Sequence, residues 1–413
     1  MKNIKIFKIG GSMLEKPTDF LKIGKKIVEN YPDSKICIIT SAMKGKTDNL
    51  IETFKNAVPK PNFWDFEKFI PLGEIESSLL FESVFNYLNI SAKSILPWHK
   101  EWPLYISFIS KRNFLEKGIN EKRNFKILEK SKLKIKKYVL PLFKNYKVII
   151  FPGFIAKDIR ERILTLGRGG SDISAILIAK LIGSKEVIFL KDTGGVMNAD
   201  PKLFQKPKKI KIIELQKLAL LASSGAKILN PIALKYADNI RKIKITSPES
   251  KSGTNVKFEE DTIYVEKEML SVLTFIGEKF PQTPGILYRI SKILYENKIS
   301  IYSITISDSI IAIYLKEEEA EIAYKILYPL LSEIENLKIL NIKKGIKKIV
   351  LRSLKFINEP GIIKKFVTPI SKEGINIWEI LTVHTDIMIF VEKEYANKTF
   401  EILKNLFNKK EKK

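Results

Sequence analysis

The residues with the clearest capacity for chemistry lie at positions 165–172, in the stretch Thr-Leu-Gly-Arg-Gly-Gly-Ser-Asp. Three glycines let the backbone turn tightly and approach a bound anion. The apolar run at 173–179 predicts a helix whose N-terminus offers unpaired N–H groups to that anion. Arg168 adds a planar fork for a carboxylate or phosphate. Asp172 would either cap the helix or act in the site, and this turn alone leaves both interpretations open.

A second polar cluster follows the first predicted strand, residues 2–9. Lys8 stands at the end of this strand, directly before Gly10, Gly11 and Ser12. Backbone N–H groups and a lysine charge in this position suit a phosphate. The pattern is weak evidence when taken alone.

Two further motifs lie next to predicted elements. A short apolar strand at 35–40 is followed by small and hydroxyl residues that include Ser41 and Thr47. Gly73 and Glu74 precede a predicted helix at 75–87. A glutamate in a first helical turn either complements the helix dipole or acts in a site, and both interpretations stay open.

The elements that must position these residues alternate between strands and helices. Apolar runs predict strands at 148–154 and 186–190, and the latter leads into a polar loop at 191–201 with two adjacent glycines. Residues 211–223 are predicted to form a helix. This alternation indicates a mostly parallel sheet covered on both faces, with ligands bound at the carboxyl ends of the strands.

The C-terminal part contains an internal repeat. Thr-Pro-Gly-Ile at 283–286 recurs as Glu-Pro-Gly-Ile at 359–362, and the segment at 299–304 recurs at the same offset at 375–380. We therefore predict two copies of one small module, each ordered strand, Pro-Gly turn, helix, strand, strand, helix. The polar stretch at 248–254 precedes them and is a possible domain edge.

Composition is that of an ordinary globular protein, with 45% hydrophobic and 29% charged residues in 413. The formal net charge is +26, but the lysines are spread along the whole chain, so we expect attraction of anionic substrates rather than a nucleic-acid partner. Cys37 is the single cysteine, which fits a reducing compartment. No signal-peptide core or membrane-length apolar run is present, so we expect a cytoplasmic location and no membrane partner.

Together the motifs resemble those of aspartate kinases, which have an amino-acid-kinase domain followed by two ACT modules. The resemblance covers nearly the whole chain apart from roughly residues 92–140. It implies an α/β amino-acid-kinase fold at 1–258 and ferredoxin-like ACT modules at 268–345 and 346–413. The motifs that carry it, in the family's order, are Lys8-x-Gly10-Gly11-Ser12, Ser41-Ala42-Met43-x-Gly45-x-Thr47, Gly73-Glu74, residues 165–172, Ala199-Asp200-Pro201 and Gly225-Ala226-Lys227.

The resemblance implies transfer of the ATP γ-phosphoryl group to the β-carboxylate of L-aspartate, with ATP and Mg²⁺ as cofactors. The product would be 4-phospho-L-aspartate, made in the first step of lysine, threonine and methionine synthesis. This reaction needs no general base, because a carboxylate with an ordinary pKa of about 4 is already ionised at neutral pH. Both histidines, His99 and His384, lie outside the matched kinase motifs.

The resemblance also implies roles for individual residues. It places Lys8 at the transferred phosphoryl group, Asp172 near magnesium and the phosphates, and Arg168 and Glu74 at the carboxylate and ammonium of aspartate. The implied catalytic residues are Lys8, Arg168 and Asp172. The implied aspartate-binding residues are Ser41, Thr47, Glu74 and Arg168. The implied ATP-binding residues are Lys8, Gly10, Gly11, Ser12, Lys191, Asp192, Met197, Lys202 and Lys227. The implied effector-binding residues are Gly277, Gln282, Ser300 and Ile301.

This chain departs from the family pattern in the nucleotide-binding segments. Lys191 stands where the family usually has threonine, Met197 where it has tyrosine, and Lys202 where it has arginine. Asn230 stands where the family usually has histidine. These differences concern adenine recognition and leave the phosphoryl-transfer residues unchanged.

Family ACT modules pair through their sheets and bind threonine or lysine, so the resemblance implies a homodimer or larger assembly and an amino-acid effector. Lys298 makes the predicted effector region basic, which disfavours a cationic ligand, so we expect threonine before lysine. Modules that only hold the oligomer together are the alternative.

Two other functions compete with the main one: a non-catalytic amino-acid sensor with a decayed kinase domain, and a kinase for another amino-acid carboxylate. Retention of Lys8, Glu74, Arg168 and Asp172 together argues against decay.

Overall fold

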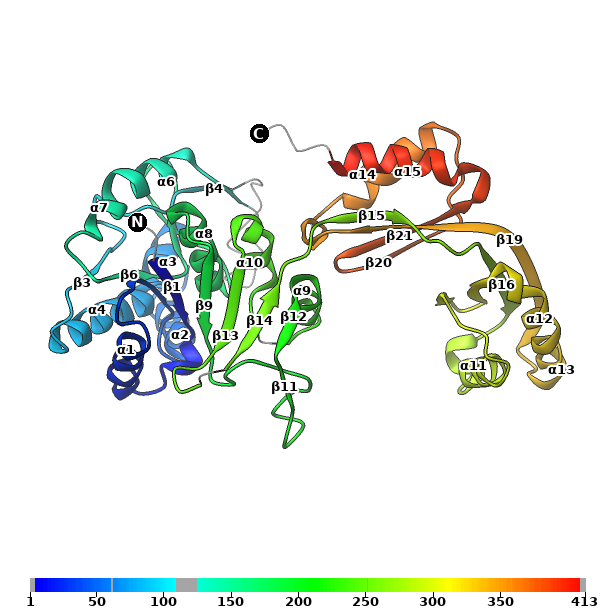
Figure 1. The fold of residues 1–413 in the computed structure, drawn as a ribbon, viewed down its shortest axis with the longest axis horizontal. Coiled ribbons are helices and arrows are strands. Elements are labelled where there is room, and N and C mark those ends of the chain that lie inside the picture. The colour runs from blue at the N-terminus through cyan, green and yellow to red at the C-terminus, as the bar shows by residue number, and fades with distance from the viewer. Residues whose placement is uncertain are drawn as a thin grey trace. The chain divides into compact units, whose positions relative to one another are not determined.

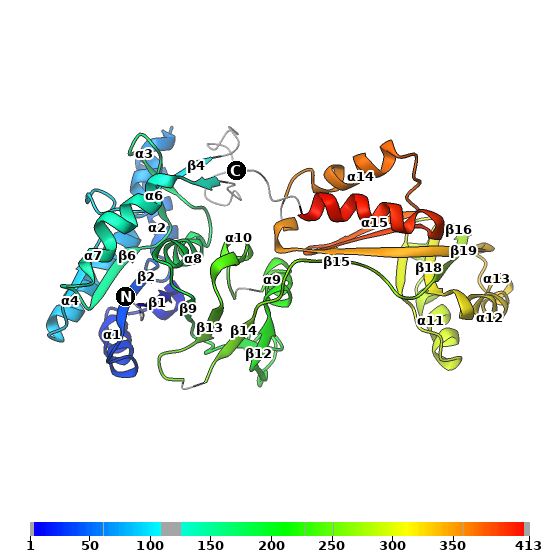
Figure 2. The same ribbon diagram turned by 45° about the horizontal axis from the view of Figure 1, so that its top comes forward.

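The computed structural model describes residues 4–60, 62–108, 125–226, 228–250, 252–357 and 359–408. The chain divides into two compact units, Met1–Glu259 and Glu260–Lys413 (Figures 1 and 2). Within the described ranges, no helix is both long and apolar enough to span a membrane.

The first unit is built on an eight-stranded sheet in the order β12-β14-β13-β9-β1-β2-β6-β3. β1 lies inside the sheet and pairs in parallel with β2 and β9. The β13–β14 pair is antiparallel and the other pairs are parallel. The predicted mostly parallel α/β sheet is confirmed. The strands are β1 (Ile4–Ile9), β2 (Lys35–Thr40), β3 (Ala92–Ser94), β6 (Val148–Pro152), β9 (Glu186–Leu190), β12 (Ile212–Glu214), β13 (Lys242–Thr246) and β14 (Thr254–Lys257).

Helices cover both faces of this sheet. α1 (Thr18–Asn30) and α4 (Leu72–Tyr87) contribute apolar side chains to a core shared with Phe7 and Ile9 of β1. Successive strand residues point to opposite faces, so Lys8 lies on the other face. α8 (Gly170–Ile182) lies beside the sheet there and contacts β1, β2 and β9 (Figure 1). It is buried along most of its length.

The other described elements of the first unit lie outside the eight-stranded sheet. They are η1 (Gly11–Met13), α2 (Lys46–Ala57), α3 (Phe63–Phe69), β4 (Ile106–Phe108), β5 (Phe125–Ile127), α6 (Glu129–Lys134), η3 (Ile135–Val139), α7 (Leu140–Leu142), β7 (Ile155–Lys157), β8 (Ile163–Thr165), β10 (Val196–Met197), β11 (Lys209–Ile210), α9 (Leu215–Ser223), α10 (Pro231–Lys235) and η4 (Ala237–Asn239).

Two expectations from the sequence are corrected in this unit. The helix predicted at 211–223 starts only at Leu215, because residues 212–214 form β12 and pair with β14. The possible domain edge at 248–254 lies inside the unit, since β14 pairs with both β13 and β12. Both features depend on strand pairing with distant segments, which local composition does not reveal.

The second unit carries one seven-stranded antiparallel sheet in the order β17-β18-β16-β19-β21-β20, with β15 also paired to β19. Its strands are β15 (Thr262–Val265), β16 (Leu270–Gly277), β17 (Ser303–Ile306), β18 (Ile310–Lys316), β19 (Leu337–Arg352), β20 (Glu379–Val383) and β21 (Asp386–Glu392). Its helices are η5 (Phe280–Gln282), α11 (Ile286–Glu296), α12 (Glu317–Leu327), α13 (Leu330–Glu333), η6 (Leu354–Phe356), α14 (Ile362–Lys372) and α15 (Lys393–Asn408).

The internal repeat is visible in these bounds. α14 begins and ends 76 residues after α11, and β21 begins and ends 76 residues after β18. Gly285 and Gly361 precede the two helices with φ of +84° and +80°, a left-handed conformation that favours glycine.

Each copy has its own apolar core, and the two are joined through β19. The first half of β19 pairs with β16 and the second half with β21. The predicted division between the modules, at 345/346, therefore falls inside one continuous strand. β15 precedes the predicted start of the first module, yet its Ile263 and Val265 pack in the core of the second.

Candidate functional site

The parallel strands of the first unit end at one edge of the sheet, and six loops begin there. They follow β1, β2, β3, β6, β9 and β13, as expected for a ligand site in an open α/β sheet. Gly11 lies so close to the loop after β2 that an added Cβ would be 2.8 Å from the Ala42 oxygen. The strand ends thus bring residues from distant parts of the chain together.

The centre of this edge is an ion pair. Lys8 Nζ lies 2.7 Å from Asp172 Oδ1, and the two side chains are only 5% and 7% exposed. Burial favours the neutral carboxyl, but the charges of Lys8 and Lys191 outweigh it and hold the pKa of Asp172 below its usual value. Burial also lowers the pKa of Lys8, against the attraction of Asp172. Asp172 is therefore ionised at neutral pH.

The glycine-rich turn forms as the sequence predicts. Gly167 and Gly169 have φ of +79° and +73°, and α8 begins at Gly170. Asp172 lies in the first turn of α8, where the helix dipole favours a negative charge. Arg168 is exposed at the tip of the turn.

The N-terminus of α8 lies unusually close to the strand ends. A Cβ added to Gly153, after β6, would be 2.6 Å from Ser171 Cβ and 2.9 Å from the Thr40 oxygen. Ser41 and Ser171 form a hydrogen bond of 2.8 Å between their hydroxyl groups. This contact joins the predicted Ser41 to the glycine-rich turn.

Glu74 is the second buried carboxylate of the site. It lies in the first turn of α4, is 5% exposed, and burial raises its pKa to about 7. Its Oε2 has no hydrogen-bond partner among the described residues. Lys8 is near enough to lower this pKa in part, so Glu74 belongs to the same electrostatic cluster.

The predicted nucleotide-binding residues separate into two groups. Lys191 is half-buried after β9, and its charge acts on both Lys8 and Asp172. Asp192 accepts a hydrogen bond of 3.3 Å from Ser12 Oγ. Met197 and Lys202 instead lie in the segment containing the β10–β11 hairpin, and Lys202 is exposed. Lys227 lies outside the described residues.

Thr47 is half-buried in the first turn of α2, beyond the Ser41 loop. The four predicted effector residues lie in the second unit. Gly277 ends β16 and its N–H donates to the Ser309 oxygen, while the Gln282 N–H donates to the Lys279 oxygen. Ser300 and Ile301 are exposed between α11 and β17.

Sequence reasoning missed Glu67 and gave Asn230 no role in the glycine-rich turn. Glu67 is fully buried in α3 and accepts hydrogen bonds from the main-chain N–H and hydroxyl of Thr165. Asn230 donates from its main-chain N–H to Asp172 and from its side chain to the Arg168 oxygen. The aromatic segment at 63–69 contains two acids, Asp65 and Glu67, and the sequence alone did not show which of them is buried.

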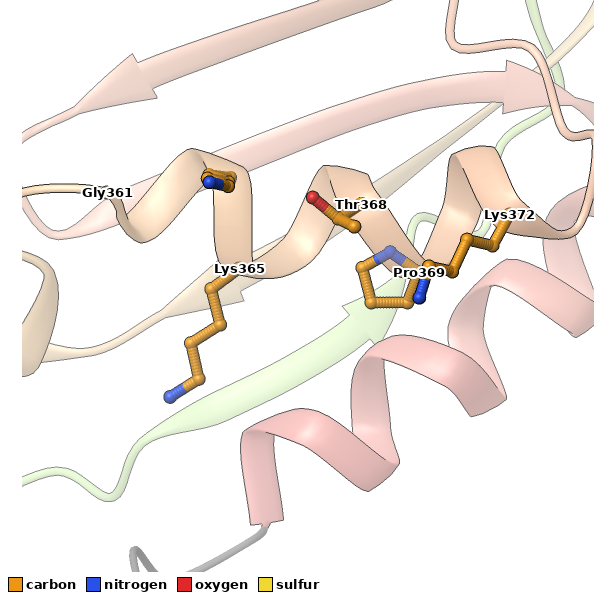
Figure 3. A pocket seen from close by; sticks show the side chains of 6 residues that line it. Gly361, Lys365, Thr368, Pro369 and Lys372 are labelled. Carbon is orange, nitrogen blue, oxygen red and sulfur yellow. The ribbon is translucent and has the colours of Figure 1, made fainter.

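A shallow hollow in the second unit has a different character. It lies along one side of α14, and Figure 3 shows its side chains projecting from this single helix. Lysines dominate it, so it lacks the paired acid and base of the strand-end site. Its lining residues are Gly361, Lys364, Lys365, Thr368, Pro369 and Lys372.

Comparison with known families decides the relationship. Residues 3–247 match the Amino acid kinase family. The chain belongs to this family. Residues 341–405 also match an ACT domain, in the region of the second repeat. The fold predicted from the sequence resemblance is therefore confirmed.

Similar proteins cover nearly the whole chain of this amino acid kinase family member. An aspartokinase of Thermus thermophilus is 25% identical over an alignment of 420 residues, and the alignment covers 97% of each chain. The aspartate kinase structure from Synechocystis matches with a TM-score of 0.68 and 21% identity, covering 99% of this chain and 70% of that one. Aspartokinase III of E. coli, in complex with aspartate and ADP, matches with a TM-score of 0.53 and 19% identity, over 98% and 99% of the two chains.

Proposed function

We propose that this protein is an ATP-dependent aspartate kinase. The observation that carries the proposal is the buried Lys8–Asp172 pair at the N-terminus of α8, with the buried carboxylate of Glu74 in the same cluster. Similarity to aspartokinases along 97% of the chain supports aspartate as the acceptor. A sensor with a decayed site would gain nothing from keeping these charged groups in such a buried position.

The reaction needs no proton transfer. The β-carboxylate of aspartate attacks the γ-phosphorus, the bond from that phosphorus to the bridging oxygen breaks, and ADP leaves with the electron pair. The barrier comes mainly from bringing two anions together, so positioning and charge neutralisation carry the catalysis. Lys8 supplies a buried positive charge for the transferred phosphoryl group, and Asp172 holds that lysine in place.

Glu74 and Arg168 would bind the amino-acid head group of the substrate. A buried carboxylate oxygen without a partner suits an ammonium ion, and an exposed guanidinium suits a carboxylate. Ser41, bonded to Ser171, and Thr47 would add hydroxyl contacts. Together these groups would select an acceptor with both charges of a free amino acid.

The ATP phosphates would lie over the glycines after β1 and the loop after β9. Gly10, Gly11 and Ser12 offer main-chain N–H groups, and Lys191 adds a second positive charge near Lys8. Met197, Lys202 and Lys227 are proposed nucleotide contacts on the strength of the family resemblance alone.

Magnesium fits the acidic groups of this site. Asp172, whose Oδ1 is paired with Lys8, is an ionised carboxylate in the site, and Asp192 lies on the neighbouring loop. Magnesium is usually held by one or two carboxylates together with substrate phosphates and water. Bound between these acids and ATP, it would neutralise phosphate charge.

We further propose that the enzyme acts in the cytoplasm at the first step towards lysine, threonine and methionine, and that its ACT modules mediate oligomerisation and effector binding. The substrate proposal is tested by ADP release with L-aspartate, L-glutamate and N-acetylglutamate as acceptors. We expect activity with aspartate far above that with the other two. Preference for either alternative would assign the site to another carboxylate.

A further inference from the structure

The glycine-rich turn at 165–172 is held at both ends by side chains from outside it. At its start, fully buried Glu67 accepts the main-chain N–H of Thr165 and, at 3.2 Å, the Thr165 hydroxyl. The Trp64 ring, on the same helix α3, stacks on the Arg162 guanidinium with 3.6 Å between ring centroid and carbon. Helix α3 is thus fixed to β8 immediately before the turn.

At the other end, Asn230 makes three hydrogen bonds at once. Its main-chain N–H donates to Asp172 Oδ2 at 2.9 Å, its Nδ2 donates to the Arg168 oxygen at 2.8 Å, and its Oδ1 accepts the Ile232 N–H at 2.8 Å. The last bond caps α10. Gly169 permits this approach, since a Cβ there would be 2.7 Å from Asn230 Nδ2.

The atoms contacted at the two ends are those that set the geometry of the site. Glu67 fixes the main chain two residues before Gly167, where the left-handed turn begins. Asn230 fixes the main chain at Arg168 and one carboxylate oxygen of Asp172, whose other oxygen pairs with Lys8. A single shift of this turn would therefore move both the Arg168 fork and the Lys8–Asp172 pair.

We propose that Glu67 and Asn230 are positioning residues that clamp the glycine-rich turn for catalysis, an inference that rests on the proposed aspartate kinase function. Neither side chain is assigned a contact with substrate. Asn230 occupies the position where the sequence departs from the family pattern, and its contacts are with the turn. The asparagine at position 230 therefore affects the positions of Arg168 and Asp172.

The side chain of Asn230 can be tested alone, because Asn230→Ala keeps the main-chain N–H that bonds Asp172. We expect kcat/KM for aspartate to fall about ten- to a hundredfold, since a misplacement of about 1 Å can cost a hundredfold in rate. KM for ATP should change less than twofold. Asn30→Ala is the matched control, because the Asn30 amide also donates to a distant main-chain oxygen, that of Pro248.

Glu67 is tested by Glu67→Leu, which removes both acceptors at similar volume, and by Glu67→Gln. The glutamine keeps an oxygen for the Thr165 N–H and offers its amide to the Thr165 hydroxyl. We expect the leucine variant to lose activity on aspartate and the glutamine variant to retain most of it. If the leucine variant does not fold, the clamp is tested by the activity of the glutamine variant on aspartate and by the effect of Asn230→Ala.

Amide hydrogen exchange separates this inference from the proposed function. Asn230→Ala should accelerate exchange in the peptide covering 165–172, whereas Asn30→Ala should not, whatever the substrate. Unchanged exchange, or unchanged kcat/KM in an enzyme active on aspartate, would overturn the clamp. An equal rise in KM for aspartate and in KM for ATP would also contradict it. If the wild-type protein is inactive on aspartate but Asn230→Ala still accelerates exchange at 165–172, the proposed function is wrong and the clamp stands.

Discussion

Lys8 and Asp172 concentrate the chemistry of this site into one buried contact of 2.7 Å. Replacing either by alanine leaves the other charge buried without its partner and removes one preorganised electrostatic contact. We expect Lys8→Ala and Asp172→Ala each to reduce turnover at least about a hundredfold, the usual scale for such a loss. ADP release by the purified, folded variants measures this, and near-normal rates in both would contradict the assignment.

Glu74 gives the reaction a pH dependence. Its pKa of about 7 means that the carboxyl is increasingly protonated below neutral pH, and a neutral carboxyl binds an ammonium ion poorly. We expect kcat/KM for aspartate to fall about tenfold per pH unit below 7, because this parameter reports the free enzyme's ionisations. A pH series from 5.5 to 8.5 measures the slope.

Glu74→Gln is the control for that profile. It should raise KM for aspartate far more than KM for ATP, and it should flatten the acid limb. An equal rise in both KM values, or an acid limb that persists unchanged, would place Glu74 in the fold rather than at the substrate ammonium.

At the scale of elements, the site depends on how closely α8 approaches the strand ends. Gly153→Ala would place a methyl group 2.6 Å from Ser171 Cβ and push α8 away from β2 and β6. We expect the stability to fall by roughly 1–3 kcal/mol, as for other overpacked sites. We also expect most of the activity to be lost. Thermal melting and turnover measure the two effects.

Gly24→Ala, within α1, is the matched substitution. An added Cβ there would lie 3.0 Å from Val84 Cγ1, on the face of the sheet opposite Lys8, and alanine favours a helix. This variant should keep full activity. Normal activity in Gly153→Ala would mean that α8 tolerates displacement and that its close approach is not required.

The turn and α8 were predictable because their signal is local. Three glycines followed by an apolar run specify a left-handed turn and a buried helix without help from distant residues. The repeat was equally readable, since α11 and α14 keep the same 76-residue offset in sequence and structure. Glu67 was not predictable in its role, because its partner Thr165 lies 98 residues away and only the fold joins them. β12 was missed for the same reason.

At the scale of the whole molecule, the second unit has edge strands that pair on one side only. Among the described strands, β17 pairs only with β18, β20 only with β21 and β15 only with β19. Ile304 and Ile306 of β17 are 40% and 41% exposed, which is unfavourable for an edge left open. We expect a homodimer or larger assembly by light scattering at micromolar concentration.

Ile306→Lys should shift that assembly towards monomer. Ile322→Lys, on the 57% exposed Ile322 of α12, should not. A wild-type monomer, or equal effects of the two variants, would contradict assembly through β17.

The second unit also sets an expectation for regulation. Lys298 lies beside the predicted effector segment, and two like charges about 4 Å apart repel by about 1 kcal/mol even in water. We expect millimolar threonine to inhibit more than millimolar lysine at subsaturating aspartate. Initial rates with each amino acid added separately measure this, and strong inhibition by lysine alone would reverse the assignment.

The central claim is the formation of an acyl phosphate on the side chain of aspartate, and trapping that product tests it most directly. The protein is incubated with MgATP, L-aspartate and hydroxylamine, which converts an acyl phosphate to a stable hydroxamate that mass spectrometry identifies. We predict aspartate β-hydroxamate in equal amount to the ADP released, and at most about a hundredth of that amount with Lys8→Ala. ADP release without hydroxamate, or a hydroxamate formed only from another carboxylic acid, would contradict the assignment of this protein as an aspartate kinase.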